Sequence, residues 1–290
     1  MKKYAITCIL TTLLSASACA GAAQQAFAGF DRNDYPGDAA LPALRRDFRY
    51  TGYWLNNPPG EHANSWTAKR ALLKRYGFGF LVLFNGRLDA QLKGRDAAQL
   101  GRADGKAAVA AAQRDGFAQN VLIFLDMEEG GRLLPEQAAY IFAWIDAVRA
   151  AGARAGVYCS GIAVHDESGI ISTAGDIAAR ESQREQSALK SGKGQHVRAK
   201  LALWIADDAC PPSPGCTLAV TPRIDALPAD LRAFTTVWQY ALSPRRMEFS
   251  AACPRNAAPD GNCYAPGLPQ AANSFVDFDS ANSPDPSEDR

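Results

Sequence analysis

The sequence predicts an α/β fold, an irregular (β/α)8 TIM-type barrel whose late strands lack full crossover helices. Eight short apolar runs recur along the 290 residues, helical patterns separate most of them, and the length suits one barrel domain. The competing fold, an open doubly wound sheet, would need a glycine-rich phosphate loop after an early strand, and the sequence offers none there.

The first 22 residues have the layout of a secretory signal peptide. Lys2 and Lys3 precede an apolar run at 5–14, and a small-residue stretch follows at 15–22. The run is too short to cross a bilayer as a helix, and no later segment is long enough, so no transmembrane segment is expected. Cys19 follows Ala-Ser-Ala and leaves lipid attachment open. We therefore expect an exported protein, periplasmic or extracellular, either free or anchored as a lipoprotein.

The barrel domain is expected over residues 26–280. The third apolar run, 77–85, is almost wholly apolar, as in a strand buried on both faces. The clearest helix, 136–151, has Pro135 at its first turn and Gly152 at its end. The eight strands are expected at 26–32, 48–55, 77–85, 120–128, 153–159, 201–206, 234–240 and 274–278. The other helices are expected at 65–76, 105–115, 176–189 and 227–232.

Two segments fall outside this pattern. Residues 162–199 are polar and contain one helical stretch, and two interpretations stay open: a mobile lid over an anionic polymer, or a solvated loop. Residues 281–290 are acidic and proline-rich and are expected to be a disordered tail.

The cysteine spacing indicates disulfides in an oxidising compartment. Cys210 and Cys216 bracket one proline-rich loop, and Cys253 and Cys263 bracket another. Zinc is the alternative, but neither pair has CxxC spacing or a nearby histidine. Cys159 lies in an apolar run and is expected to be a buried free thiol. No metal or other cofactor is expected.

The overall charge argues against polyanionic partners. The net charge is +1 and charged residues make up 21% of the chain, so neither nucleic acid nor an anionic membrane surface is an expected partner. We expect a monomer.

Acidic residues stand where several predicted strands end, which is where barrel enzymes place their active sites. Asp31, Asp277 and the pair Asp126 and Glu128 follow this rule. Two residues apart on a strand, Asp126 and Glu128 would share a face, with α-carbons roughly 6.6 Å apart. An apolar floor and a like charge would raise the pKa of one carboxyl, as a general acid requires. Helix-capping acids in a βα loop are the alternative, which the coincidence at several strand ends disfavours.

Six segments form a recognisable series along the chain. They are Gly29-Phe30-Asp31, Phe124-Leu125-Asp126-Met127-Glu128, Gly156-Val157-Tyr158-Cys159-Ser160, Leu203-Trp204-Ile205-Ala206, Val237-Trp238-Gln239-Tyr240 and Val276-Asp277-Phe278-Asp279. In order and spacing they resemble the motifs of the lysozyme-like family 25 glycoside hydrolases. The resemblance implies that Glu128 is the general acid and that Asp126, Asp31 and Asp277 orient the substrate and stabilise positive charge. Members of that family cleave the β-1,4 bond between N-acetylmuramic acid and N-acetylglucosamine in peptidoglycan.

Three segments depart from the family 25 pattern: 31–37, 51–57 and 84–87. They are closer to the glycoside hydrolase-like domain family of unknown function found in exported bacterial proteins. Two functions therefore stay open. One is an exported glycosidase that acts on peptidoglycan or a related amino-sugar polymer. The other is a non-catalytic protein that binds cell-wall or other glycans on the same barrel.

Aromatic and amide side chains near the strand ends are candidates for sugar contacts. Flat aromatic faces suit the apolar faces of sugar rings. Trp66 and Trp238 are further aromatic candidates, but Trp238 and Trp204 have packing between barrel and helices as an equally good interpretation. The expected substrate-binding residues are Tyr53, Tyr158, Trp204, Gln239 and Asp279.

Overall fold

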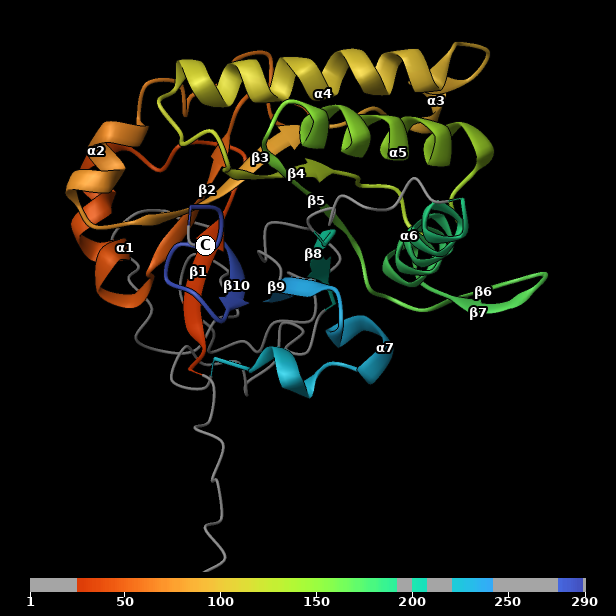
Figure 1. Ribbon diagram of the computed structural model, residues 1–290. Coiled ribbons are helices and arrows are strands. Elements are labelled where there is room, and N and C mark those ends of the chain that lie inside the picture. The colour runs from red at the N-terminus through yellow and green to blue at the C-terminus, as the bar shows by residue number, and fades with distance from the viewer. Residues whose placement is uncertain (1–24, 192–199, 208–220, 242–275, 289–290) are drawn as a thin grey trace, which may run out of the picture.

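The computed structural model describes residues 25–191, 200–207, 221–241 and 276–288 (Figure 1). Eight strands form a closed barrel in the order β1-β10-β9-β8-β5-β4-β3-β2, which confirms the predicted irregular barrel. A separate hairpin contains β6 (Val164–Asp166) and β7 (Gly169–Ile171). The barrel strands are β1 (Phe27–Asp31), β2 (Tyr50–Trp54), β3 (Gly79–Asn85), β4 (Leu122–Asp126), β5 (Arg154–Ser160), β8 (Ala202–Ala206), β9 (Thr235–Ala241) and β10 (Asp277–Ala281).

The closing strand runs opposite to the others. β10 pairs antiparallel with both β1 and β9, whereas the remaining barrel pairs are parallel. The predicted strand 274–278 therefore had the wrong direction, and Asp277 begins β10 instead of ending a parallel strand. Because the direction is reversed, Asp277 still lies opposite Asp31, at the carboxyl end of β1.

Helices cover the early part of the barrel more completely than the late part (Figure 1). In the described chain between β8 and β9, only a 3-10 turn (Ile224–Ala226) and α7 (Ala229–Arg232) occur. This agrees with the predicted lack of full late crossovers. The earlier helices are α1 (Leu41–Asp47), α2 (Arg70–Arg75), α3 (Asp89–Leu92), α4 (Ala97–Arg114), α5 (Pro135–Ala150) and α6 (Thr173–Lys190).

Helices α4 and α5 lie side by side over the barrel (Figure 1). The backbones touch at two glycines of α4. A Cβ on Gly101 would come 2.2 Å from the carbonyl oxygen of Tyr140, and one on Gly105 would come 2.8 Å from that of Trp144. The predicted helix 105–115 began too late, because the side chain of Asp96 accepts a hydrogen bond from the Gln99 N–H and caps α4.

The predicted helix 65–76 is shorter in the structure, where α2 covers only Arg70–Arg75. The preceding residues form turns instead. The Asn64 side chain accepts from the Trp66 backbone N–H and donates to the Trp54 carbonyl, and Ala68 has a φ of 64°. Asparagine favours such local hydrogen bonds over helix.

Residues 162–191 contain regular secondary structure and are not a simple loop. They form the β6–β7 hairpin and α6, which is capped by Ser172 and provides the crossover between β5 and β8. The buried Glu181 of α6 accepts from Arg149 of α5 at 2.6 Å, which fixes α6 to its neighbour. The solvated-loop interpretation of 162–199 is therefore wrong for this part, the lid interpretation stays a prediction, and 192–199 lie outside the described residues.

The tail that was predicted to be disordered is ordered through residue 288. The backbone N–H groups of Phe80 and Val82 donate to the side chains of Asp285 and Ser287 at 2.9 and 3.0 Å. The Ser287 carbonyl accepts from the N–H of Leu122. The tail therefore satisfies backbone groups at the starts of β3 and β4, where neighbouring strands leave them unpaired.

Cys159 is buried and free, as predicted, and burial raises the pKa of its thiol to about 12. Among the described residues, no helix has the length and hydrophobicity needed to cross a membrane. Several predictions lie outside the described residues: the signal peptide at 1–22 with Cys19, and the pairs Cys210, Cys216, Cys253 and Cys263.

Candidate functional site

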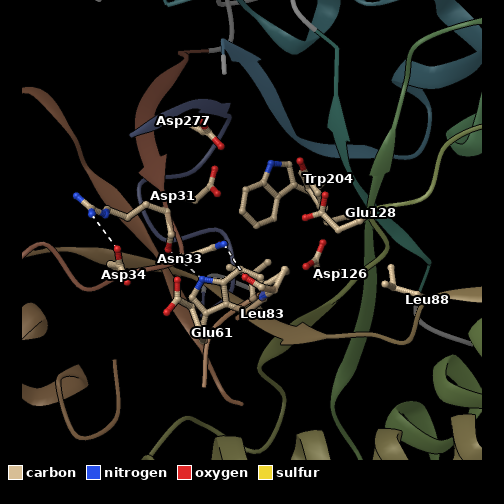
Figure 2. Close-up of a pocket in the computed structure, with 14 residues that line it drawn as sticks. Asp31, Asn33, Asp34, Glu61, Leu83, Leu88, Asp126, Glu128, Trp204 and Asp277 are labelled. Carbon is tan, nitrogen blue, oxygen red and sulfur yellow. Dashed lines mark hydrogen bonds and ion pairs between the residues drawn. The ribbon is translucent and has the colours of Figure 1, made fainter. Parts of the chain in front are cut away.

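A cavity of about 500 Å³ opens at the carboxyl ends of the early strands (Figure 2). It contains all four predicted catalytic carboxyl groups, from β1, β10 and the end of β4. Its described lining residues are Asp31, Arg32, Asn33, Asp34, Trp54, Pro59, Glu61, Leu83, Leu88, Asp126, Glu128, Tyr158, Trp204 and Asp277.

One side of the pocket is held by a hydrogen-bond chain across the barrel. The Tyr158 hydroxyl donates to Oε1 of Gln239 at 2.8 Å, and Nε2 of Gln239 donates to Oδ2 of Asp31 at 2.8 Å. Asp31 and Gln239 are both buried. Gln239 therefore lies behind the pocket, where it orients the Asp31 carboxyl and the Tyr158 ring, and it is not itself among the lining residues.

Asp126 is the most unusual carboxyl in the pocket. Its side chain is 3% exposed, and neither of its oxygens has a hydrogen-bond partner among the described residues. Burial, and then the negative charges of Glu128 and Asp31, raise the pKa of Asp126 well above its usual range. Asp126 therefore holds a proton more strongly than an ordinary aspartic acid, and both its oxygens have unused hydrogen-bonding capacity among the described residues.

Glu128 lies beyond the strand on which it was predicted. β4 ends at Asp126, and Glu128 is an exposed residue of the following loop that still lines the pocket (Figure 2). Its neighbour Glu129 fixes this loop by accepting from the Asp89 N–H and from Nε2 of Gln137, each at 2.7 Å. The pair thus differs in environment: Asp126 is enclosed, whereas Glu128 reaches solvent.

Trp204 forms part of the pocket floor and is held by Asp279. The indole Nε1 donates to Oδ1 of Asp279 at 2.9 Å, and the ring contacts Phe124 and Tyr158 edge-on. Trp204 therefore lies inside the barrel, and the interpretation that it packs between barrel and helices is wrong.

Asp279 is fully buried below the pocket and does not line it. Its burial is the largest factor that raises its pKa well above the usual range. The charges of Asp31 and Asp277 and a hydrogen bond with Asp31 act in the same direction. The structure thus places Asp279 as a support for Trp204 and Asp31, one layer beneath any ligand.

Tyr53 is not part of the pocket, which corrects one predicted substrate contact. Its hydroxyl donates to Asp115 at 2.9 Å, and its ring packs against Trp66, Phe80 and Phe117. Its side chain thus points out of the barrel toward the helices. Trp238 is not among the lining residues either, and its Nε1 donates to the Asp207 carbonyl.

The wall beside β1 was missed by sequence reasoning. The indole groups of Trp54 and Trp66 donate to the carbonyls of Arg32 and Asn33, and Nδ2 of Asn33 donates to the Pro59 carbonyl. These bonds hold the loop after β1 against the loop after β2. The wall they form contributes Arg32, Asn33, Asp34, Pro59 and Glu61 to the pocket.

The segments that depart from the family 25 pattern build this wall. Nδ2 of Asn56 donates to the Asn85 carbonyl, and the Asn85 N–H donates to Oδ1 of Asn56, so the ends of β2 and β3 are joined reciprocally. The departures of these segments from the family 25 pattern were the only sequence feature that pointed to this part of the site. They did not indicate its shape.

The described part of the pocket shows its carboxyl groups spread around a space and not gathered at one point (Figure 2). In the part of the chain that the structure describes, no group of three or more His, Cys, Asp or Glu side chains is placed to hold a metal ion. The carboxyl groups instead surround an open space (Figure 2).

A family model described as "Rv2525c-like, glycoside hydrolase-like domain" matches residues 48–207. No curated protein sequence is significantly similar to the chain. Three solved structures are similar to the chain to different degrees. An uncharacterized B. stearothermophilus protein has 21% identity, a TM-score of 0.57, and coverage of 88% of this chain and 95% of the other.

The Clostridium perfringens spore cortex lytic enzyme SleM has 15% identity and a TM-score of 0.51, with coverage of 89% of this chain and 68% of the other. The Mycobacterium tuberculosis Tat-secreted protein Rv2525c has 11% identity and a TM-score of 0.47, with coverage of 89% and 96%. For the B. stearothermophilus protein and SleM, the likeness at these identities shows the fold alone.

Proposed function

Because the chain belongs to the Rv2525c-like glycoside hydrolase-like domain family, we propose that it is an exported glycosidase acting on peptidoglycan or a related amino-sugar polymer. Membership of this family confirms the resemblance inferred from the sequence. The observation that carries the proposal is that four carboxyl groups from β1, β4, the loop after β4 and β10 line one pocket: Asp31, Asp126, Glu128 and Asp277.

Glycoside hydrolysis needs two carboxyl groups with different tasks. In the proposed reaction Glu128 protonates the leaving oxygen as the glycosidic bond breaks, and its exposed position gives it access to solvent for reprotonation. Water adds to the anomeric carbon and loses its proton to a carboxylate of the pocket. Asp126 contacts the sugar from the enclosed side, where its unpartnered oxygens would be satisfied by substrate. Asp31 and Asp277 orient the sugar and stabilise the positive charge that develops on the ring.

The remaining predicted residues have supporting roles in this proposal. Tyr158 and Trp204 contact substrate directly from the pocket floor, while Gln239 and Asp279 hold those contacts in place. Tyr53 is left out because it packs on the outer side of the barrel.

Export is proposed on the sequence of residues 1–22, with a barrel domain from residue 26 onward. Whether Cys19 carries a lipid can be tested by the mass of the mature protein. The same measurement under non-reducing conditions tests the proposed Cys210–Cys216 and Cys253–Cys263 disulfides. We propose a monomer, which sedimentation analysis would check.

The decisive experiment is incubation of the mature protein with purified peptidoglycan and mass spectrometry of the released fragments. Wild type should release disaccharide-containing fragments, Glu128→Gln should not, and Glu167→Gln, which changes an exposed residue of the hairpin, should behave as wild type. If wild type releases nothing yet sediments with the polymer, the glycosidase proposal is wrong and the protein is a glycan-binding member of its family.

A further inference from the structure

The pocket is strongly acidic for a site that receives a carbohydrate. Of its fourteen described lining side chains, six carry carboxyl groups and one, Arg32, carries a guanidinium. Nη2 of Arg32 lies 3.5 Å from Oδ2 of Asp34, so part of its charge is matched at the rim. The acidic lining residues are Asp31, Asp34, Glu61, Asp126, Glu128 and Asp277.

Asp126 adds a second and independent observation. A buried carboxyl without hydrogen bonds destabilises the folded state, because it has lost its hydrogen bonds to water and has formed none with the protein. Its two oxygens have no described partner, although it lines the cavity and is almost fully enclosed. Its burial and the negative charges of Glu128 and Asp31 all raise the pKa of Asp126, because each of them disfavours the ionised carboxylate. A cationic donor from a ligand would supply the missing hydrogen bonds and would also stabilise the ionised carboxylate.

The arrangement fits an organic cation better than a metal ion. Metal sites draw three or more ligands to one point, and no such group occurs among the described residues. Figure 2 shows Asp31 and Asp277 on one side of the space and Asp126 and Glu128 on the other, with the Trp204 ring between them. A sugar ring bearing an ammonium group offers an apolar face to the indole and charged donors to the carboxyl groups.

We propose that the pocket selects amino sugars whose amine is free, so that the preferred substrate is a de-N-acetylated hexosamine polymer. The inference rests on the proposed function only in taking the ligand to be a glycan. An ammonium group has three donors, enough to bond both oxygens of Asp126 and one further carboxylate. A sugar with its own carboxylate, such as N-acetylmuramic acid, meets like charges from several directions.

The test is isothermal titration of the catalytically silenced Glu128→Gln protein at pH 6 with two probes, the hexamer of glucosamine and the hexamer of N-acetylglucosamine. The glucosamine hexamer should bind about tenfold or more tightly, as for one added charge-assisted hydrogen bond. The difference should shrink in 1 M salt, because exposed parts of the interaction are screened.

Two variants in the same background locate the effect. Adding Asp126→Asn should remove most of the preference, whereas adding Glu167→Gln, a matched loss of one charge on the exposed hairpin, should preserve it. Circular dichroism of each variant checks the fold. If the double variant with Asp126→Asn is folded and keeps the full preference, the assignment is wrong.

The remaining outcomes separate the two proposals. Equal affinity for the two probes, or tighter binding of the acetylated one, would overturn the present inference, as would stoichiometric displacement of the hexamer by millimolar Mg²⁺. A preference for glucosamine without hydrolysis of any glycan by wild type would sustain this inference while the glycosidase proposal fails. Hydrolysis of acetylated peptidoglycan without a preference would do the reverse.

Discussion

Replacing Asp126 by Asn should stabilise the protein even though it damages the proposed site. Asp126 is buried without a described hydrogen-bond partner, and its pKa lies well above the ordinary value of 3.8. Between pH 4 and its native pKa, the native state therefore keeps a proton that the unfolded state releases. The free energy of unfolding therefore falls as pH rises through this window, by about 1.4 kcal/mol in total for each unit by which the native pKa exceeds the unfolded one.

The amide of Asn cannot ionise, so the variant lacks this pH-dependent loss. Its amide is still unpaired, which offsets part of the gain. We expect the free energy of unfolding at pH 7 to rise by about 1–3 kcal/mol. For a domain of this size, that corresponds to a midpoint increase of about 2–4 °C per kcal/mol. At pH 3.5 Asp126 is protonated in the native state and mostly protonated in the unfolded state, so the gain should nearly vanish.

The assay is guanidinium unfolding of wild type and Asp126→Asn at pH 3.5, 5 and 7, with two spectroscopic probes to check for two-state behaviour. Glu167→Gln serves as the control and should change stability by less than about 0.5 kcal/mol, because Glu167 is exposed. A variant that is less stable than wild type at pH 7, or one whose gain is the same at pH 3.5, would refute the reasoning.

Three further predictions follow from contacts elsewhere. Ser287→Ala leaves the buried Val82 N–H without its acceptor and should lower the free energy of unfolding by about 1–3 kcal/mol in guanidinium titrations; no change would mean that the tail is dispensable. Gly101→Ala places a methyl against the Tyr140 carbonyl and should cost about 1–3 kcal/mol, seen as a lower melting temperature; an unchanged value would contradict the close helix contact. Gln239→Leu removes the amide that orients the pocket side chains and should slow fragment release from peptidoglycan about tenfold or more with an unchanged circular dichroism spectrum, whereas wild-type rates would show that this amide is idle.

The strands were predictable because parallel barrel strands are buried on both faces and read as near-continuous apolar runs. The run 77–85 is the clearest example, and β3 occupies Gly79–Asn85 within it. Strand direction was not predictable by the same reasoning. An apolar run has the same pattern in either direction, so β10 was expected to be parallel. The ordered tail was missed because its partners lie some 200 residues earlier in the chain.

The parts of the site that lie at strand ends could be predicted from the sequence, whereas the parts formed by loops could not. Asp31 and Asp126 reach one pocket because strand ends meet at one rim. Alternation along a strand shows which residues share a face but not which face points inward, so Tyr53 was placed on the wrong side. The wall from Asn33 to Glu61 depends on side-chain hydrogen bonds to backbone carbonyls, which no periodic pattern encodes.

From the position of the antiparallel closing strand we expect a late step in the folding of this barrel. β10 fills the gap between β1, at the start of the domain, and β9, so neither neighbour is fully paired until the last part of the chain arrives. The entropy of joining such distant segments must be overcome before closure contributes any stability. Until then two strand edges stay open to pairing with other chains. Products shortened before residue 277 should accordingly accumulate as aggregates instead of as partly active barrels, and the rate of barrel closure should respond to changes in β10 more than to changes in the early strands.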